Sequence, residues 1–400
     1  MAKIDDSVKK KVPELRFKGF TDEWEQRKLG DEVRIVMGQS PNSENYTDDP
    51  NDYILVQGNA DMKNGRVLPR VWTTQVTKQA EKDDLILSVR APVGDIGKTA
   101  YDVVIGRGVA AIKGNEFIFQ SLGKMKSDGY WTRYSTGSTF ESINSTDIKE
   151  AIISVPAIEE QDKIGSFFKQ LDKTITLHQR KLDLLKEQKK GYLQKMFPKN
   201  GAKVPELRFE GFTDDWEERK LGEVFNQTVE YINPNEANLE LWSVTVERGL
   251  TPKTARYNRE ALVKKNDKFK VVHDGDIVYN PMNLTIGAVG FNKSEKSVAV
   301  SGYYVTMNMN SGFNNSYFQI WLKSENAIKQ YKLYATGSLI EKQRVQFPTL
   351  SLIKSYIPTF EEQQKIGSFF KQLDETIALH QRKLDLLKEQ KKGFLQKMFV

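Results

Sequence analysis

Two long stretches of the chain carry apolar residues at alternating spacings of four and three positions. The first runs from Ile164 to Met196 and the second from Ile366 to Met398. Residues three and four apart share one face of an α-helix, so this spacing is the heptad pattern of a coiled coil. A helix of about 40 residues would extend roughly 60 Å, which is too long for burial inside one small domain. The pattern therefore predicts two long helices that pack against each other. Antiparallel pairing is favoured, because parallel pairing would require the chain to return through an entire domain.

A histidine interrupts each heptad seam, at His178 in the first helix and His380 in the second. A metal site would need further ligands, and the sequence has no cysteine and only three histidines. A polar residue that fixes the register of the helices is the favoured interpretation.

A second apolar flank lies beside each seam and would stay uncovered in a simple two-helix pair. We therefore expect another protein to bind there. The flank contains Phe167, Leu184, Leu193 and Phe197, which return as Phe369, Leu386, Leu395 and Phe399. The residues expected to bind the partner are Phe167, Leu184, Phe369 and Leu386.

The helical stretch belongs to a larger internal duplication. Residues 12–30 return as residues 204–222 with 16 of 19 positions identical, and residues 156–197 return as 358–399 with 36 of 42 identical. The offsets are far longer than the periods of solenoid or propeller repeats, so the chain is a duplicated half-protein. We call these four blocks the repeated frame. The expected organisation is an N-terminal segment 1–30, a first insert 31–155, a central region 156–222, a second insert 223–357 and a distal helix 358–400.

The two inserts share little sequence, yet they carry similar elements in similar places. Short runs of β-branched and apolar residues predict strands, and longer amphipathic runs predict helices before a Thr-Gly-Ser turn at 136–138 and at 336–338. Each insert is therefore expected to be an α/β (α+β) domain, and the two to be diverged copies of one fold related by a pseudo-twofold repeat. The expected strands are 83–90, 101–106 and 108–114, then 274–280, 286–291 and 302–308; the expected helices lie in 117–134 and 316–334.

Catalytic motifs are not found in the sequence. Gly97-Lys98-Thr99 resembles the end of a phosphate-binding loop, but the required first glycine is Pro92, so we interpret the stretch as a hairpin turn. Tyr279-Asn280-Pro281-Met282 is an incomplete version of an amino-methyltransferase motif. Zero cysteines exclude thiol catalysis and disulfides, and three histidines make a hydrolytic triad improbable. The sequence indicates a binding protein without catalytic or metal-ligating residues.

The net charge of +7 and the pI near 9.1 favour polyanionic partners only mildly. The charge is uneven, because the first insert sums to −3 and the second to +4. The second insert thus suits a nucleic-acid reader better than the first. No apolar run of 18 residues occurs and the N-terminus lacks the apolar core of a signal peptide, so a cytoplasmic protein without membrane contact is expected.

This organisation resembles the DNA-specificity subunit of type I restriction–modification enzymes. The resemblance covers essentially the whole chain and depends on the two variable inserts, on their Thr-Gly-Ser turns and on the helical block that opens with Pro-x-x-x-Glu-Gln at 156–161 and 358–363. The opening RFxGFTxxWExRKLG and the Lys-rich end LLKEQKKG(Y/F)LQKMF are equally characteristic.

The resemblance implies two target-recognition domains that each read one half of a split, asymmetric sequence in double-stranded DNA. It implies an antiparallel coiled coil between them, to which two modification subunits attach. Those subunits would bind S-adenosylmethionine and methylate adenine, and restriction subunits using ATP and Mg would join the full complex. The specificity chain itself would bind no cofactor and catalyse nothing.

Residues that read bases are expected among the polar and basic side chains of the inserts, since these types reach base edges and phosphates. One alternative remains open: a coiled-coil adaptor with two protein-binding domains would show the same duplication. The candidates are Gln39, Ser40, Arg90, Arg107 and Ser138 in the first insert, and Asn280, Asn283, Ser338, Gln343 and Arg344 in the second.

Overall fold

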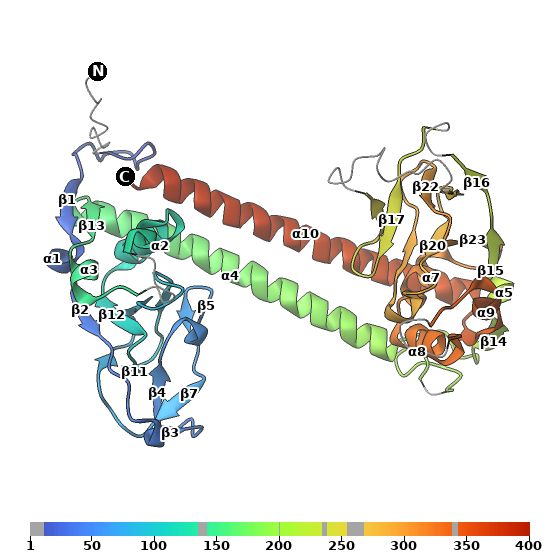
Figure 1. Ribbon diagram of the computed structural model, residues 1–400, viewed down its shortest axis with the longest axis horizontal. Helices are drawn as coiled ribbons and strands as arrows, with labels where there is room; N and C mark the ends of the chain where they lie inside the picture. The colour runs from blue at the N-terminus through green and yellow to red at the C-terminus, as the bar shows by residue number, and fades with distance from the viewer. Residues whose placement is uncertain (1–11, 135–141, 200, 234–237, 254–267, 338–342) are drawn as a thin grey trace. The chain divides into compact units, whose positions relative to one another are not determined.

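The computed structural model describes residues 12–134, 142–199, 201–233, 238–253, 268–337 and 343–400. The chain forms two compact units (Figure 1). The first unit joins Met1–Gln179 with Arg382–Val400, and the second is Arg180–Gln381. Each unit therefore contains one insert, the start of one long helix and the end of the other.

The first unit contains two main sheets. A six-stranded sheet has the order β2-β12-β9-β10-β6-β5, and a five-stranded sheet has the order β3-β7-β4-β11-β8. The strands are β1 (Glu25–Lys28), β2 (Arg34–Met37), β3 (Tyr46–Thr47), β4 (Tyr53–Val56), β5 (Met62–Lys63), β6 (Arg66–Val67), β7 (Val71–Thr73), β8 (Gln79–Ala80), β9 (Leu85–Ser88), β10 (Ile96–Lys98), β11 (Val103–Ile105), β12 (Val109–Lys113) and β13 (Ile152–Val155). The helices are α1 (Leu29–Glu32), α2 (Glu116–Ser127), α3 (Ser145–Lys149) and the start of α4 (Ile158–Lys195).

The second unit contains a four-stranded sheet of order β15-β23-β20-β21, a three-stranded sheet β16-β19-β22 and the hairpin β17-β18. Its strands are β14 (Glu217–Lys220), β15 (Phe225–Thr228), β16 (Tyr231–Ile232), β17 (Trp242–Thr245), β18 (Gly249–Pro252), β19 (Phe269–Val272), β20 (Ile277–Tyr279), β21 (Val289–Phe291), β22 (Val298–Ser301), β23 (Val305–Met309) and β24 (Lys354–Ile357). Its helices are α5 (Leu221–Val224), α7 (Asn315–Trp321), α8 (Glu325–Tyr334), α9 (Phe347–Leu352) and the start of α10 (Phe360–Met398).

Each insert contains a sheet with the same strand order. The order β2-β12-β9-β10 in the first unit is repeated as β15-β23-β20-β21 in the second, with all neighbours antiparallel. This confirms that the inserts are diverged copies of one fold. One detail of the prediction was wrong: Gly97 and Lys98 lie on strand β10 of the hairpin, because the turn that joins it to β9 falls earlier, between Ser88 and Ile96.

The long helices pair antiparallel within each unit, as the heptads predicted. In the first unit, the ring of Phe168 near the start of α4 lies 5.7 Å from that of Phe399 near the end of α10. In the second unit, the ring of Phe370 near the start of α10 lies 6.3 Å from that of Phe197 beyond the end of α4. The seam residues, at alternating spacings of four and three from Ile164 to Met196 and from Ile366 to Met398, are all buried or partly buried. The partner helix and, at the start of each helix, the adjoining insert cover them.

The glycine of the repeated Ile-Gly-Ser-Phe-Phe motif allows the insert to approach its helix. A Cβ on Gly165 would lie 3.0 Å from Cβ of Glu116 in α2, and one on Gly367 would lie 2.8 Å from Cβ of Ser316 in α7. A larger residue would therefore push α2 or α7 away from the long helix. Figure 1 shows α2 beside the start of α4.

The apolar flank of the long helices is largely covered by the chain itself, which corrects the expectation that it is open. Phe167 packs edge-on against Phe17 at 6.0 Å and against Phe394 at 5.0 Å. Phe369 packs in the same way against Phe209 at 5.8 Å, because the segment 204–216 repeats the segment 12–24. Leu193 and Leu395 are partly buried, and Phe197 and Phe399 are buried. By contrast, Leu184 and Leu386 are about half exposed, at 51% and 47%.

Candidate nucleic-acid interface

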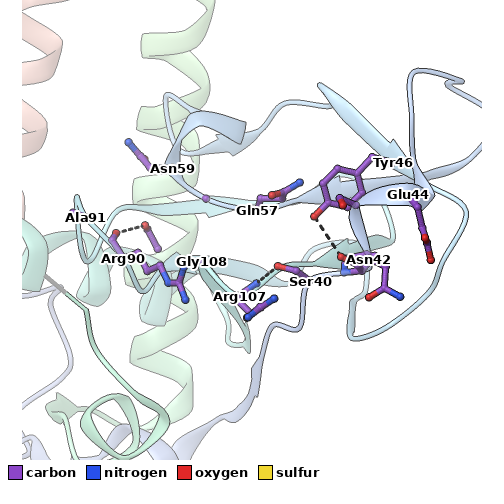
Figure 2. Close-up of a pocket in the computed structure, with 14 residues that line it drawn as sticks. Ser40, Asn42, Glu44, Tyr46, Gln57, Asn59, Arg90, Ala91, Arg107 and Gly108 are labelled. Carbon is purple, nitrogen blue, oxygen red and sulfur yellow. Dashed lines mark hydrogen bonds between the residues drawn. The ribbon is translucent and has the colours of Figure 1, made fainter. Parts of the chain in front are cut away.

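The first insert contains a polar cleft of about 760 Å³ at the ends of several strands (Figure 2). It contains three of the candidates proposed from the sequence, Ser40, Arg90 and Arg107. These residues come from three separate segments, which lie together because β2, β12 and β9 are neighbours in the six-stranded sheet. The lining is completed by Pro41, Asn42, Ser43, Glu44, Tyr46, Gln57, Gly58, Asn59, Ser88, Ala91 and Gly108.

Close backbone packing gives the cleft its shape. Ser40 Oγ accepts a hydrogen bond from the backbone N–H of Arg107 at 3.1 Å, which ties the loop after β2 to the loop before β12. A Cβ on Gly108 would lie 2.0 Å from the backbone carbonyl oxygen of Gln57, so only glycine fits there. The nearly buried Asp61 accepts hydrogen bonds from the backbone N–H of Gln57 and of Gly58. The wall that carries Gln57 is therefore fixed by the chain's own hydrogen bonds.

The two arginines of the cleft are available to bind a ligand. Arg90 and Arg107 are both exposed, and neither guanidinium has an ion pair with any described residue. A guanidinium presents several N–H donors in one plane, which matches a phosphate or the two acceptors on the major-groove edge of guanine. Asparagine and glutamine side chains beside them supply both donors and acceptors, the combination that matches adenine.

One candidate of the first insert, Gln39, is not among the residues that line the cleft. Gln39 is exposed next to the cleft, and its backbone carbonyl oxygen accepts a hydrogen bond from Thr77 Oγ1. Ser138 lies outside the described residues. Sequence reasoning missed Asn42, Gln57 and Asn59, which line the cleft from irregular segments that the strand patterns did not predict.

The described candidates of the second insert also lie close together, around the turn that follows β20. Asn280 Oδ1 accepts from the backbone N–H of Met282, which shapes this turn, and Asn283 is exposed on it. The backbone of Val345 donates to the carbonyl oxygen of Pro281 at 3.0 Å, which places the segment containing Gln343 and Arg344 beside the turn. Ser338 lies outside the described residues.

A tyrosine joins this second surface. The guanidinium of Arg344 lies 5.8 Å from the ring centroid of Tyr303, within the range of a cation–π contact. Tyr303 precedes β23 as Arg107 precedes β12, within the matching stretches GRGV and GYYV. That match was the signal that would have identified Tyr303 from the sequence.

Two lysines border a further exposed tyrosine of the second insert, Tyr231. The ammonium groups of Lys268 and Lys270 lie 5.5 Å and 5.7 Å from its ring centroid. Lys270 is largely buried and donates to the carbonyl oxygen of Tyr304 at 2.7 Å. Burial lowers the pKa of Lys270, because an ammonium group removed from water is less stable than the neutral amine.

The described part of the chain contains no cluster of three or more histidine, cysteine, aspartate or glutamate residues that could hold a metal ion. Within the same residues, no helix has the length and apolar character needed to cross a bilayer. Tyr279, the tyrosine of the methyltransferase-like stretch, is fully buried, and burial raises the pKa of its hydroxyl. It therefore cannot contact a substrate.

Comparison with known proteins agrees with this architecture. The family model described as "Type I restriction modification DNA specificity domain" matches residues 21–187 and again residues 213–389. The putative type I restriction enzyme MjaX specificity subunit of Methanocaldococcus jannaschii is 32% identical over 177 residues, a match that spans 42% of this chain and 41% of that subunit. The MjaVIII specificity subunit of the same organism is 21% identical over 94% of this chain and 91% of that subunit.

Solved structures show the same fold. The S subunit of a type I restriction–modification system from M. genitalium superposes with a TM-score of 0.66 at 16% identity, covering 97% of this chain and 99% of that one. A chain from a structure on complex assembly and conformational transition of the type I system gives a TM-score of 0.51 at 16% identity, with 94% and 97% coverage.

The chain is a duplicated protein with two sheet domains and two long antiparallel helices, and the S subunit from M. genitalium shares this fold. Because the family model matches both halves, the chain belongs to the type I restriction–modification DNA specificity subunits. In this family the subunit supplies specificity to the complex, and it neither catalyses the reaction nor binds a cofactor itself.

Proposed function

We propose that this chain reads a bipartite, asymmetric site in double-stranded DNA and holds two modification subunits on its helical frame. The recognition domains are residues 31–155 and 223–357. Restriction subunits join the same complex through the modification subunits, and the complex acts in the cytoplasm. S-adenosylmethionine belongs to the modification subunits, and ATP and Mg belong to the restriction subunits.

One observation carries the proposal: the two inserts present different side chains at corresponding positions of two sheets that have the same strand order. Arg107 in the first insert corresponds to Tyr303 in the second, and the main-chain bond from Ile143 to Val89 corresponds to that from Val345 to Pro281. Two copies of one scaffold with different surface residues are suited to reading two different short sequences. The site therefore need not be palindromic.

The side chains of both surfaces suit DNA. Arg90, Arg107 and Arg344 can donate to the O6 and N7 acceptors of guanine or to phosphates. Gln57, with Asn42 and Asn59 beside it, can pair with adenine. Each correct base contact contributes about 1–3 kcal/mol to discrimination against the wrong base pair.

The frame offers a matching surface in each unit. In the first unit, Leu177 of α4 and Leu386 of α10 are exposed, and in the second unit Leu184 of α4 and Leu379 of α10 are exposed. The same surface thus occurs once in each unit, and a surface that occurs twice can bind two copies of one partner. Exposed leucines are a feature of protein contact sites, so we assign them to the modification subunits.

A domain exchange tests the DNA-reading part. Replacing residues 31–155 with the insert of a relative should change one half of the methylated site, as determined by sequencing methylated adenines. Replacing residues 223–357 is the matched control and should change the other half. A single exchange that alters both halves would contradict the two-reader arrangement.

A second experiment tests the partner surface. Leu184→Asp with Leu386→Asp should weaken assembly with the modification subunit, measured by size-exclusion chromatography with light scattering. Gln188→Asp with Gln390→Asp adds the same charge at exposed positions of the same helices and should leave assembly unchanged. If the two double variants assemble equally well with the modification subunit, the leucines do not belong to the interface. The adaptor alternative predicts no DNA binding even with every partner present, so an electrophoretic shift of the assembled complex distinguishes it.

A further inference from the structure

Lysines gather in the second unit where the insert meets the long helices. Lys293 follows β21, Lys323 follows α7, and Lys189 and Lys371 project from α4 and α10. Asp374 of α10 is paired with Lys189, whose Nζ lies 2.5 Å from its carboxylate. The ammonium of Lys323 lies near the β17–β18 hairpin, 3.4 Å from the position that a Cβ on Gly249 would take.

The two lysines of the insert, Lys293 and Lys323, lack a direct counter-charge among the described residues. Lys293 and Lys323 form no ion pair with any residue of the described ranges, and each keeps part of its side chain in water while the neighbouring protein removes part of its hydration. Loss of hydration lowers the pKa of Lys323, and the positive charges of Lys189 and Lys293 lower it further. The pKa of Lys293 is lowered by loss of hydration and by Lys371, although Asp374 opposes this. Lost hydration is the main cause for both lysines, and a bound anion would supply the counter-charge that neither receives from an ion pair among the described residues.

The first unit lacks both insert lysines at equivalent positions. Asn292 and Thr99 correspond, because each donates its backbone N–H to the aspartate that precedes the hairpin, so Lys293 corresponds to Ala100. Gly165 faces the backbone of Phe117 as Gly367 faces that of Tyr317. Phe117 and Tyr317 therefore correspond, and six residues after each of them lie Gly123 and Lys323.

The first unit also balances its remaining charges at this place. Asp172, the counterpart of Asp374, accepts from Lys391 and from Gln120 Nε2. Glu116 lies 3.6 Å from Lys98 Nζ, whereas its counterpart in the second unit is Ser316, which carries no charge. The first unit keeps Lys169 as the counterpart of Lys371, but it has an additional carboxylate, Glu116, and lacks the two insert lysines, so its junction is less positive than that of the second unit.

We infer that the lysine cluster of the second unit binds phosphates of the DNA backbone and makes the second recognition domain the electrostatic anchor of the subunit. This deepens the proposed function and rests on it. Lysine is a point charge that suits phosphodiesters and carries no sequence information. The net charge of +4 on the second insert, against −3 on the first, favours a polyanion over a small anion as the occupant.

Removal of the two insert lysines tests the inference in the complex with modification subunits. The double variant Lys293→Gln, Lys323→Gln should flatten the dependence of log affinity on log salt by about 1.8, since each phosphate contact contributes about 0.9. The loss should be equal for target and non-target DNA, on the order of tenfold near physiological salt. The methylated sequence should not change.

The first unit offers the reciprocal variant, Ala100→Lys with Gly123→Lys. Ala100 is exposed, and a Cβ added at Gly123 in α2 would meet no atom within 4 Å, so both lysines fit. This variant should steepen the salt dependence by a similar amount. Combined with Lys293→Gln and Lys323→Gln in one protein, it should restore the affinity that those two substitutions remove. A circular dichroism spectrum and thermal melt of each variant confirm that its folding is unchanged.

Three results would overturn the inference. An unchanged salt slope in Lys293→Gln, Lys323→Gln means that no phosphate lies there. A loss confined to target DNA means that the lysines read bases. Weakened assembly with an unchanged DNA slope means that an acidic surface of the modification subunit occupies the cluster. The slope on non-target DNA is measured even if the complex discriminates no target site, so failure of the proposed function is a separate result.

Discussion

Arg16 and Glu160 form a bidentate ion pair, with Nε and Nη2 of the arginine each 2.7 Å from a carboxylate oxygen. The indole N–H of Trp24 donates to the same carboxylate at 3.2 Å. Glu160 is the glutamate of the Pro-x-x-x-Glu-Gln motif, and Arg16 and Trp24 belong to the RFxGFTxxW motif. This ion pair explains why the two motifs occur together, because it binds the N-terminal segment to the start of α4.

Removal of this carboxylate should destabilise the first unit strongly. Glu160 is 1% exposed and Arg16 is 14% exposed, so Glu160→Gln would leave a nearly buried guanidinium without its counter-charge. We expect a loss of about 3–5 kcal/mol in the free energy of unfolding, measured by urea denaturation. The repeated pair Arg208–Glu362 has the same geometry, so Glu362→Gln should act equally on the second unit.

The exposed pair of Arg27 with Glu25 provides the control for that measurement. Its side chains are 50% and 67% exposed, and such pairs contribute little to stability because water screens the charges. Glu25→Gln should therefore change the unfolding free energy little. A loss as large as that of Glu160→Gln would show that burial does not determine the effect.

Truncation of the aromatic contact between the two long helices should also be costly. Phe168 is fully buried against Phe399, and Phe168→Ala should cost about 3–5 kcal/mol through lost burial and a cavity. Leu177→Ala lies on the same helix at an exposed position and should stay within about 0.5 kcal/mol. Thermal unfolding of the two variants side by side checks both values.

Arg344→Ala should relax recognition in one half-site only. The guanidinium stands over Tyr303 on the surface of the second insert, so its loss should cost about 1–3 kcal/mol at the affected base pair. Sequencing of methylated adenines should show degeneracy in that half and none in the other. Arg107→Ala is the counterpart and should relax the opposite half. Degeneracy in the same half for both variants would contradict the assignment.

Asp276 should make stability depend on pH in an unusual direction. Burial raises the pKa of its carboxyl above the ordinary 3.8, so the folded state disfavours the charged form. Asp276→Asn keeps an oxygen for the backbone N–H of His273 and should raise the melting temperature at pH 7. As the pH falls through the raised pKa, the wild-type carboxyl is protonated and this cost disappears. The advantage of the variant should therefore shrink progressively and be absent below pH 3.8.

The long helices and the doubling of the fold were predictable because both depend on local periodicity and on repeated blocks. The strands at 83–90 and 302–308 were predictable for the same reason, although the structure shortens them to Leu85–Ser88 and Val305–Met309. The pairing of Arg16 with Glu160 was not predictable, since the two residues lie 144 positions apart and no periodicity connects them.

The candidate site was predictable where residue type and position at a strand end coincided. Ser40, Arg90 and Arg107 met that condition, and the structure gathers them in one cleft. Gln57 and Asn59 did not, because they lie around a short 3-10 turn that no pattern marked. The cover over Phe167 was missed because it comes from Phe17, in a segment whose sequence shows no helical or strand periodicity.

The composition of the first unit sets an order of events during synthesis. Its core contains Phe117 and Phe168, and it closes only when Phe399 stacks on Phe117 at 5.1 Å. Phe399 leaves the ribosome after the whole second unit, Arg180–Gln381, has already been made. The domain translated first is thus completed last, and until then it exposes the apolar surface that the end of α10 will cover.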